Sequence, residues 1–326
     1  MNKRILITGG AGFIGFHLAK ELLRRNENVI VTVLDNFSNS ARDKDFQDLL
    51  AKYPDTLKVL ELDLAYESLE KLEEIEVDEV YHLAGVRGTK YANHGANALS
   101  VNIMSTFRVI EWYRETQAKV LFASTGEVWG GLPPYTVELP AKETCPVGFS
   151  DVYDARWTYA ASKIAGEMAF IHTPGTWRWS IVRMQNPYGP RMGWDNVVPK
   201  FIQKILDGEQ ELWVQTPMDT RPFTYIDDVV DGLIRVMESA ETNGQIINVA
   251  SPLEVTVGAL ARRLLRIAGH DGLEAKYPDT PQPIREYRKL DVIKLYKLGW
   301  QPTVDLEEGL RRTFEWYKAH HGVSTV

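Results

Sequence analysis

The chain has 326 residues, of which 44% are hydrophobic and 25% charged, and its net charge is −7 at pH 7. This composition is typical of a globular protein with one large or two modest domains. The acidic balance argues against nucleic acid as the main partner, and no apolar run approaches the roughly 20 residues of a membrane helix. Cys145 is the single cysteine, so we expect no disulfide, no cysteine-rich metal site and a cytoplasmic location.

The most informative segment has the sequence TGGAGFIG and ends at Gly15. A short apolar strand over 4–8 leads into it, and the apolar spacing over 13–26 predicts a helix after it. Gly9 allows a tight turn, Gly12 lets the backbone approach a pyrophosphate, and Gly15 lets the helix pack close to the strand. A diphosphate would then lie at the helix N-terminus, where free amides and the helix dipole favour an anion.

An acidic residue follows at the distance that dinucleotide binding requires. Asp35 comes directly after a second apolar run, 29–34, and lies 20 residues beyond Gly15. A carboxylate there can accept hydrogen bonds from both ribose hydroxyls of NAD and would repel the additional phosphate of NADP. No Arg or Lys follows before Arg42, so the sequence predicts NAD as the cofactor.

The rest of the chain alternates strand and helix patterns. Further strand-like runs lie at 57–62, 79–83, 119–124 and 179–184, and helical patterns at 96–115, 155–171 and 227–237. This order predicts an α/β fold, a Rossmann-like doubly wound parallel sheet. Prolines become frequent after residue 186. We therefore expect an NAD-binding domain over 1–175, a return segment near 222–250, and a smaller substrate-binding lobe within 176–326.

A candidate catalytic pair lies on one of these helices. Tyr159 and Lys163 are four residues apart, so they share one helical face. The pKa of a phenol is about 10, so it is a poor base at neutral pH unless a cation stabilises the phenolate. Lys163 can supply that cation. Tyr159 could then remove a proton from a substrate hydroxyl while a hydride moves to NAD.

These motifs together resemble the extended short-chain dehydrogenases/reductases of the sugar-nucleotide epimerase/dehydratase type. The resemblance covers nearly the whole chain. It rests on TGGAGFIG (8–15), DN (35–36), DL (63–64), HLAG (82–85), Asn102, STGEVWG (124–130), YAASK (159–163), NPYGPRM (186–192), RPFTYIDDVV (221–230) and LGWQP (298–302).

The resemblance implies roles for individual residues. It assigns catalysis to Thr125, Tyr159 and Lys163, and pairs the helices that carry Asn102 and Tyr159 across a homodimer. The residues that it places against NAD are Gly9, Gly12, Phe13, Ile14, Gly15, Asp35, Asn36, Asp63, Leu64, Leu83 and Ala84, with Tyr159 and Lys163. The residues that it places against a nucleoside-diphosphate sugar are Asn186, Arg191 and Arg221.

Glu127 bears on the fate of a 4-keto sugar once it has formed. Dehydratases of the deoxythymidine-diphosphoglucose kind carry an Asp-Glu pair here, but this chain has Gly126 before Glu127. The Thr-x-Glu arrangement is similar to decarboxylases of UDP-glucuronate and to GDP-mannose dehydratases. A 4-keto hexuronate is a β-keto acid that loses carbon dioxide readily. Glu127 could protonate C5, and Arg288, or alternatively Arg285, could hold the carboxylate.

Three hypotheses for function therefore remain open. The first is an NAD-dependent enzyme that decarboxylates or dehydrates a sugar nucleotide through a 4-keto intermediate. The second is a nucleotide-sugar 4-epimerase of the same fold. The third is a catalytically silent protein that binds NAD and regulates a partner.

Overall fold

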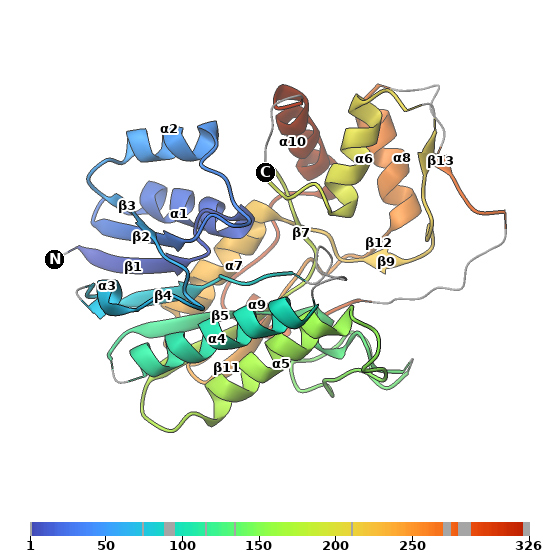
Figure 1. Ribbon diagram of the computed structural model, residues 1–326. Coiled ribbons are helices and arrows are strands. Elements are labelled where there is room, and N and C mark those ends of the chain that lie inside the picture. Colours follow the sequence, from blue (N-terminus) through green and yellow to red (C-terminus); the bar gives the residue numbers. More distant parts are fainter. Residues whose placement is uncertain are drawn as a thin grey trace.

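The computed structural model describes residues 2–73, 75–87, 95–114, 116–133, 135–209, 211–269, 275–279 and 288–321. Its large sheet has seven strands in the order β11-β6-β5-β4-β1-β2-β3, and every neighbouring pair is parallel. The strands are β1 (Lys3–Thr8), β2 (Val29–Asp35), β3 (Leu57–Glu61), β4 (Glu79–His82), β5 (Lys119–Thr125), β6 (Arg178–Met184) and β11 (Gln245–Val249). The predicted Rossmann-like doubly wound fold is confirmed (Figure 1).

The chain begins in the middle of this sheet, runs outward to β3 and then crosses back to β4. The order of the strands therefore reverses between β1 and β4, which pair with Thr8 opposite His82. In open parallel sheets, ligands bind at such a reversal, beyond the carboxyl ends of the strands. The predicted cofactor and catalytic residues follow the carboxyl ends of β1, β2, β4 and β5.

Helices cover both faces of the sheet. On one face lie α1 (Phe13–Arg25), α2 (Lys44–Lys52) and α7 (Ile226–Glu238), and on the other α4 (Gly95–Tyr113) and α5 (Trp157–His172), which run side by side in Figure 1. The alternation of side chains along a strand explains both layers. Ile5 and Ile7 pack in the cluster that includes α1 and α7, whereas Leu6 packs in the cluster that includes α4 and α5.

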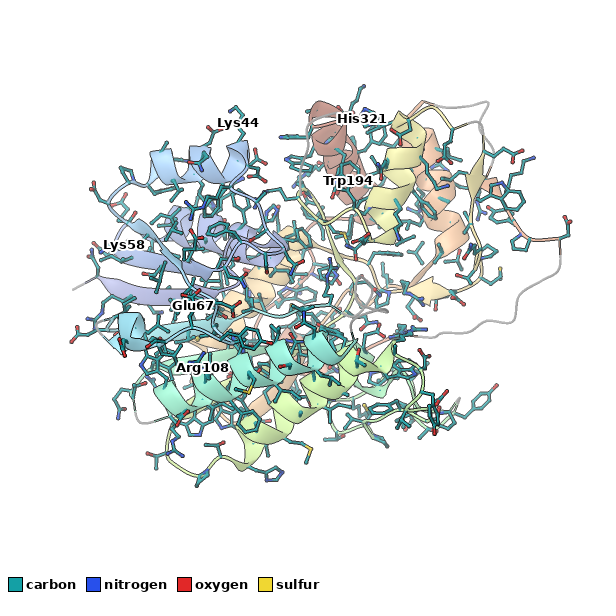
Figure 2. The ribbon with its side chains drawn as sticks, viewed as in Figure 1. Lys44, Lys58, Glu67, Arg108, Trp194 and His321 are labelled. Carbon is teal, nitrogen blue, oxygen red and sulfur yellow. The ribbon has the colours of Figure 1, made fainter. Side chains whose placement is uncertain are left out.

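A second group of elements lies beyond the carboxyl edge of the sheet (Figure 1). Three amphipathic helices, α6, α8 and α10, contact one another there. The remaining elements of the chain are α3 (Glu70–Glu73), η2 (Gly126–Trp129), β7 (Pro187–Tyr188), α6 (Val197–Leu206), β8 (Leu212–Trp213), β9 (Thr220–Arg221), β10 (Thr224–Tyr225), η3 (Ala240–Thr242), β12 (Val255–Thr256), α8 (Val257–Ile267), β13 (Ala275–Lys276), α9 (Ile293–Lys297) and α10 (Leu306–Ala319). Of these, α3, η3 and α9 pack against the large sheet. Trp194 anchors this group by packing edge-on against Tyr317, at a ring-centroid distance of 4.6 Å (Figure 2).

A buried ion pair fixes α5, the helix of the candidate catalytic pair, against the sheet. Arg183 of β6 donates from Nη2 to Oε2 of Glu167 (2.7 Å) and from Nε to Oε1 (2.9 Å). Ser124 of β5 donates to the same carboxylate at 2.5 Å. A bidentate, charge-assisted pair in the interior holds its geometry strictly. The helix that carries Tyr159 and Lys163 is thus tied to the ends of two strands.

The observed elements agree closely with the predicted ones. The helix expected at 155–171 begins two residues later, at Trp157, because Asp154 accepts from the Arg156 N–H and forms a turn before it. The large sheet also takes in β6 and β11, both beyond residue 175. Among the described residues, no helix is long and apolar enough to cross a membrane.

Candidate active site

The glycine turn after β1 leaves open space at the N-terminus of α1. Gly9 has a φ of +69°, and a Cβ there would lie 2.8 Å from the backbone of Ala84. Gly12 precedes the helix, and a Cβ there would meet only the Gly9 carbonyl. Among the described side chains, none caps this helix end. Phe13, Ile14 and Gly15 form its first turn, so their amides face a site that suits the diphosphate of NAD.

Asp35 lies at the end of β2, next to this turn. Its carboxylate accepts hydrogen bonds from the backbone N–H groups of Ala11 (3.1 Å) and Phe37 (2.9 Å) and from the Ser40 hydroxyl (2.8 Å). These donors fix its orientation, and Asp35 stays buried. The carboxylate therefore lies at the carboxyl end of β2, next to the glycine turn, and its contact with the ribose of NAD stays a prediction.

A second acidic residue flanks the same crevice. Asn36 donates from Nδ2 to Asp63 at 2.8 Å, and Asp63 also accepts from the Ala65 N–H. Leu64, which is buried, has its carbonyl held by Arg108 of α4 at 3.1 Å. Figure 2 labels Arg108 and, in the loop after β3, Glu67, whose carboxylate accepts the Asp63 N–H at 3.0 Å. Asp63 and Leu64, which the resemblance places against NAD, thus lie in one loop that hydrogen bonds hold in place.

A buried histidine network positions the segment after β4. His82 contacts Thr8 Oγ1 through Nδ1 (2.8 Å) and Thr106 Oγ1 through Nε2 (3.3 Å). The Ala84 N–H donates to Thr8 Oγ1 at 3.2 Å. Burial lowers the pKa of His82 to about 3, so the ring is neutral at pH 7. The segment with Leu83 and Ala84 is therefore held through Thr8, which contacts both the neutral ring of His82 and the Ala84 N–H.

Asn102 of α4 links this segment to the catalytic helix. Its Oδ1 accepts the Val86 N–H (2.7 Å), and its Nδ2 donates to the Val86 carbonyl (3.0 Å) and to Ser162 Oγ of α5 (2.9 Å). A Cβ at Gly85 would lie 3.3 Å from Nζ of Lys163. The loop after β4 thus passes directly over the lysine.

The structure brings Tyr159 and Lys163 together on α5. The Lys163 Nζ lies 5.9 Å from the centre of the Tyr159 ring, and the side chain is 4% exposed. Burial lowers the pKa of Lys163 to about 8, which leaves the ammonium mostly charged at pH 7. Burial raises the pKa of Tyr159 to about 12, while Arg87 lowers it and Glu127 raises it. The phenol is therefore protonated before ligands bind.

Thr125 and Glu127 lie at the end of β5. The Thr125 hydroxyl accepts the Glu127 N–H at 3.2 Å and caps the short helix η2. The Glu127 carboxylate forms an ion pair with Nη1 of Arg288 and lies 3.9 Å from Nη2 of Arg156. The Arg288 side chain is only 1% exposed, and a Cβ at Gly130 would lie 2.8 Å from its Nη1. An acid and a buried cation thus meet beside the candidate base.

The three predicted diphosphate residues are placed differently. Asn186 has a φ of +42°, and its buried Nδ2 has no hydrogen-bond partner among the described residues. Arg221 of β9 lies 3.8 Å from Asp219. The Arg191 guanidinium pairs with Asp43 at 2.7 Å and stacks on Phe16 of α1, at 3.9 Å from the ring centre. The structure thus holds Arg191 against α1, the helix that follows the glycine turn. The competing residue, Arg285, lies outside the described residues.

Two residues near the site were not predicted. Arg87, in the loop after β4, donates to Asn196 Oδ1 at 2.8 Å, so it joins the sheet's edge to the start of α6. Gln185 directly follows β6 and is 2% exposed. A signal for Gln185 exists in the sequence, since an uncharged polar residue follows an apolar strand just before Asn186. Arg87 has no such signal, because its partner is more than a hundred residues away.

Two comparisons with known sequences extend this picture. The family described as "NAD dependent epimerase/dehydratase family" matches residues 5–250. UDP-N-acetyl-alpha-D-glucosaminuronate decarboxylase of Bacillus cytotoxicus is 33% identical to this chain, and the match covers 98% of this chain and 98% of that protein. UDP-glucuronic acid decarboxylase 6 of Arabidopsis thaliana is also 33% identical, and the match covers 99% of this chain and 91% of that protein.

Solved structures with the same fold have other activities. UDP-glucose 4-epimerase of Thermotoga maritima, solved with UDP-glucose, has a TM-score of 0.80 and 27% identity, and the match covers 97% of this chain and 99% of that one. TunA, an NAD-dependent NDP-hexosamine 5,6-dehydratase of tunicamycin biosynthesis, has a TM-score of 0.79 and 30% identity, over 98% of both chains. The neighbours thus include both an epimerase and a dehydratase.

Proposed function

Because the chain belongs to the NAD-dependent epimerase/dehydratase family, we propose that it decarboxylates a UDP-hexuronate through a 4-keto intermediate. The observation that carries this proposal is the pairing of Glu127 with the buried Arg288 beside Tyr159. A hexuronate carries a carboxylate where an ordinary hexose carries a hydroxymethyl group, and Arg288 is a buried cation that can hold this carboxylate. Two relatives named for such decarboxylations match almost the whole chain.

The predicted enzyme class is confirmed: this is an NAD-dependent enzyme that modifies a sugar nucleotide. NAD, when bound, would supply the acceptor for the hydride from C4 of the sugar and, once reduced, the donor that gives it back. The hypothesis of a catalytically silent NAD-binding protein has no support from the relatives. It is also at odds with the presence of both Tyr159 and Lys163.

We propose that Asp35 selects NAD over NADP. Asp35→Ala is expected to weaken NAD binding by about 1–3 kcal/mol, because the ribose hydroxyls lose their acceptor. Since Asp35 also accepts from Ala11, Phe37 and Ser40, Asp35→Asn serves as the matched variant that keeps the shape and removes the charge. Calorimetric titration of both variants with NAD and NADP measures the effect. Tighter binding of NADP by the parent protein would show that this assignment is wrong.

The first half of the proposed reaction is the oxidation at C4, and its residues are Tyr159, Thr125 and Lys163. Thr125 fixes the C4 oxygen by a hydrogen bond, and Tyr159 removes the proton from that hydroxyl. The charge of Lys163 favours the phenolate and so offsets the burial that raises the pKa of Tyr159 to about 12. The product is a 4-keto hexuronate, in which the carboxylate is β to the ketone.

The second half falls to Arg288 and Glu127. The C5–C6 bond breaks, carbon dioxide leaves, and the electron pair moves to the C4 oxygen as an enolate. Hydrogen bonds from Thr125 and Tyr159 stabilise that oxygen. When the carboxylate of the substrate takes the place of Glu127 on Arg288, Glu127 takes up a proton from solvent, and it then transfers that proton to C5. A dehydratase needs an acid for a leaving hydroxyl, and position 126 holds a glycine instead. This difference counts against a dehydratase of the deoxythymidine-diphosphoglucose kind, and the two relatives named as decarboxylases favour decarboxylation.

The diphosphate of the substrate is assigned to Asn186 and Arg221. Within the described part of the chain, the buried Nδ2 of Asn186, two residues after β6, has no hydrogen-bond partner and is available as a donor. Arg221 brings a cation from the small strand β9. Arg191 stays a predicted substrate contact as well. Its pairing with Asp43 supports a position nearer the cofactor diphosphate than the sugar.

Mass spectrometry of the products tests the function. The purified protein is incubated with UDP-glucuronate, with UDP-N-acetylglucosaminuronate and with UDP-, GDP-, CDP- and dTDP-hexoses. Loss of the mass of carbon dioxide from a hexuronate is the expected result. Loss of the mass of water would indicate a dehydratase. An unchanged mass with an altered NMR spectrum would indicate the 4-epimerase.

We further propose a homodimer through α4 and α5. Four apolar side chains are exposed on these adjacent helices, namely Met104, Phe107, Met168 and Ile171. Sedimentation is expected to give twice the chain mass of 37.0 kDa, and the double variant Phe107→Glu/Met168→Glu is expected to give the monomer, because charge would be buried in the contact. A parent protein that sediments as a monomer would contradict the proposal. The cytoplasmic location stays a prediction.

A further inference from the structure

The carboxamide of Gln185 is buried beside the catalytic residues. Its backbone is held at the sheet's edge, since the N–H donates to the Val249 carbonyl and the C=O accepts from Thr224 Oγ1, both at 3.3 Å. Its side-chain Oε1 and Nε2 are both buried, and neither has a hydrogen-bond partner among the described residues. Buried polar groups are almost always paired, so one that is not needs an explanation.

The amide occupies the space of a side chain at position 126. A Cβ at Gly126 would overlap Oε1 of Gln185 and would lie 3.0 Å from its Cδ. The register explains this contact, because Thr125 at the end of β5 pairs with Met184 at the end of β6. The next residue after each strand, Gly126 and Gln185, therefore lies at the same level of the sheet. The glycine therefore leaves room for a polar group that arrives from the neighbouring strand.

We propose that the Gln185 carboxamide binds the C5 carboxylate of the sugar, with Nε2 as the donor. This inference rests on the proposed function. Gly126 lies between Thr125, which acts at C4, and Glu127, which acts at C5, so the amide lies against the backbone segment that carries both side chains. An amide supplies N–H donors for a carboxylate without a titratable proton, so it can hold the anion without competing with Glu127 for protonation of C5.

Arg288 completes the same subsite from the other side of η2. Its guanidinium lies against Gly130, and the amide of Gln185 lies against Gly126. A glycine at each end of the short helix η2 thus leaves room for one of these two groups. The charge of Arg288 attracts the carboxylate, and the N–H donors of the Gln185 amide fix its orientation. Together they would discriminate a hexuronate from a hexose that carries a hydroxymethyl group at C5.

Gln185→Leu tests this inference by binding and by stability. Titrations are made in the Tyr159→Phe background, so that the substrate is not consumed. We expect the Kd for UDP-glucuronate to rise by about 10- to 100-fold, the scale of one hydrogen bond to a charged group. The Kd for UDP should stay unchanged, and the Kd for UDP-glucose should change less than that for UDP-glucuronate.

The same variant separates a ligand-binding amide from a structural one. An unpartnered buried amide can be replaced by an apolar side chain of similar size without loss of stability. The Tm of Gln185→Leu without ligand should therefore equal or exceed that of the parent protein. A clear fall in Tm, an unchanged Kd for UDP-glucuronate, or equal weakening of UDP or UDP-glucose would each overturn the inference.

A swap of the two positions provides a second test. Gly126→Ser alone should disturb the site, because the new side chain meets the amide of Gln185. In the double variant Gly126→Ser/Gln185→Ala, a hydroxyl replaces the amide in the same space. We expect this variant to bind UDP-glucuronate more tightly than Gln185→Ala does. Equal or weaker binding would show that the amide does not stand in for a side chain at position 126.

The proposed function is tested separately by release of carbon dioxide from the parent protein. If that release is absent and Gln185→Leu still weakens UDP-glucuronate selectively, the subsite holds and the reaction is misassigned. If carbon dioxide is released and Gln185→Leu binds the substrate normally, the reaction holds and the inference about Gln185 is wrong.

Discussion

Tyr159→Phe is expected to lower kcat by about 10²- to 10⁴-fold, the scale of general acid–base catalysis, and to leave substrate binding nearly unchanged. The substitution removes one hydroxyl and changes little volume, so the ring keeps its place on α5 over Lys163. Only the base is lost. The loss should therefore appear in kcat, with a substrate Kd close to that of the parent protein.

Steady-state rates and calorimetric titration with UDP-glucuronate give the two quantities. Tyr296→Phe, a partly exposed tyrosine on α9, is the matched control and should have the rate of the parent protein. Lys163→Ala should lower kcat as well and also weaken NAD, because the ammonium is proposed to serve both. Near-normal turnover by Tyr159→Phe would mean that another group removes the proton.

The fold could be predicted from the sequence because its signals are local. Each strand of the large sheet up to β6 is a short apolar run, and each long helix has an apolar spacing within its own residues. The turn at Gly9 requires a positive φ and a close approach to Ala84, and only glycine meets both demands. The conformation of such a motif is determined by a few consecutive residues, so it can be predicted from the sequence.

The contacts that complete the candidate site are not local. Arg288 meets Glu127 across 161 positions of the chain, and the Arg191–Asp43 pair spans 148. Nothing near Arg191 in the sequence shows that an aspartate will lie beside it. A motif can thus identify a charged residue as part of the site, but it cannot say which partner the charge meets after folding.

Gly126 shows how a missing side chain can mislead. In the sequence it is simply the loss of the dehydratase's aspartate. In the structure the vacated space is filled by Gln185 from the adjacent strand. The space beside Gly126 is therefore occupied by a polar group, although position 126 itself has no side chain. Only the register of β5 with β6 reveals it.

Glu127→Gln separates the decarboxylase from the 4-epimerase. The substitution keeps the shape of the side chain and removes its ionisable proton. If C5 must be protonated, we expect final product to fall by about 10²- to 10⁴-fold. Oxidation at C4 does not need Glu127, so a 4-keto sugar should accumulate and can be detected by mass spectrometry. A plain 4-epimerase moves no proton at C5, and its turnover should barely change.

Because Glu127 also pairs with Arg288, the variant removes the opposite charge from a buried guanidinium. Its Tm must therefore be compared with that of the parent protein before the rates are interpreted. Glu138→Gln, an exposed carboxylate later in the same loop, is the matched control and should leave both Tm and rate unchanged. A folded Glu127→Gln protein that forms product at the rate of the parent protein would refute decarboxylation through Glu127. That result would favour the 4-epimerase, because only a reaction without protonation at C5 is indifferent to this carboxylate.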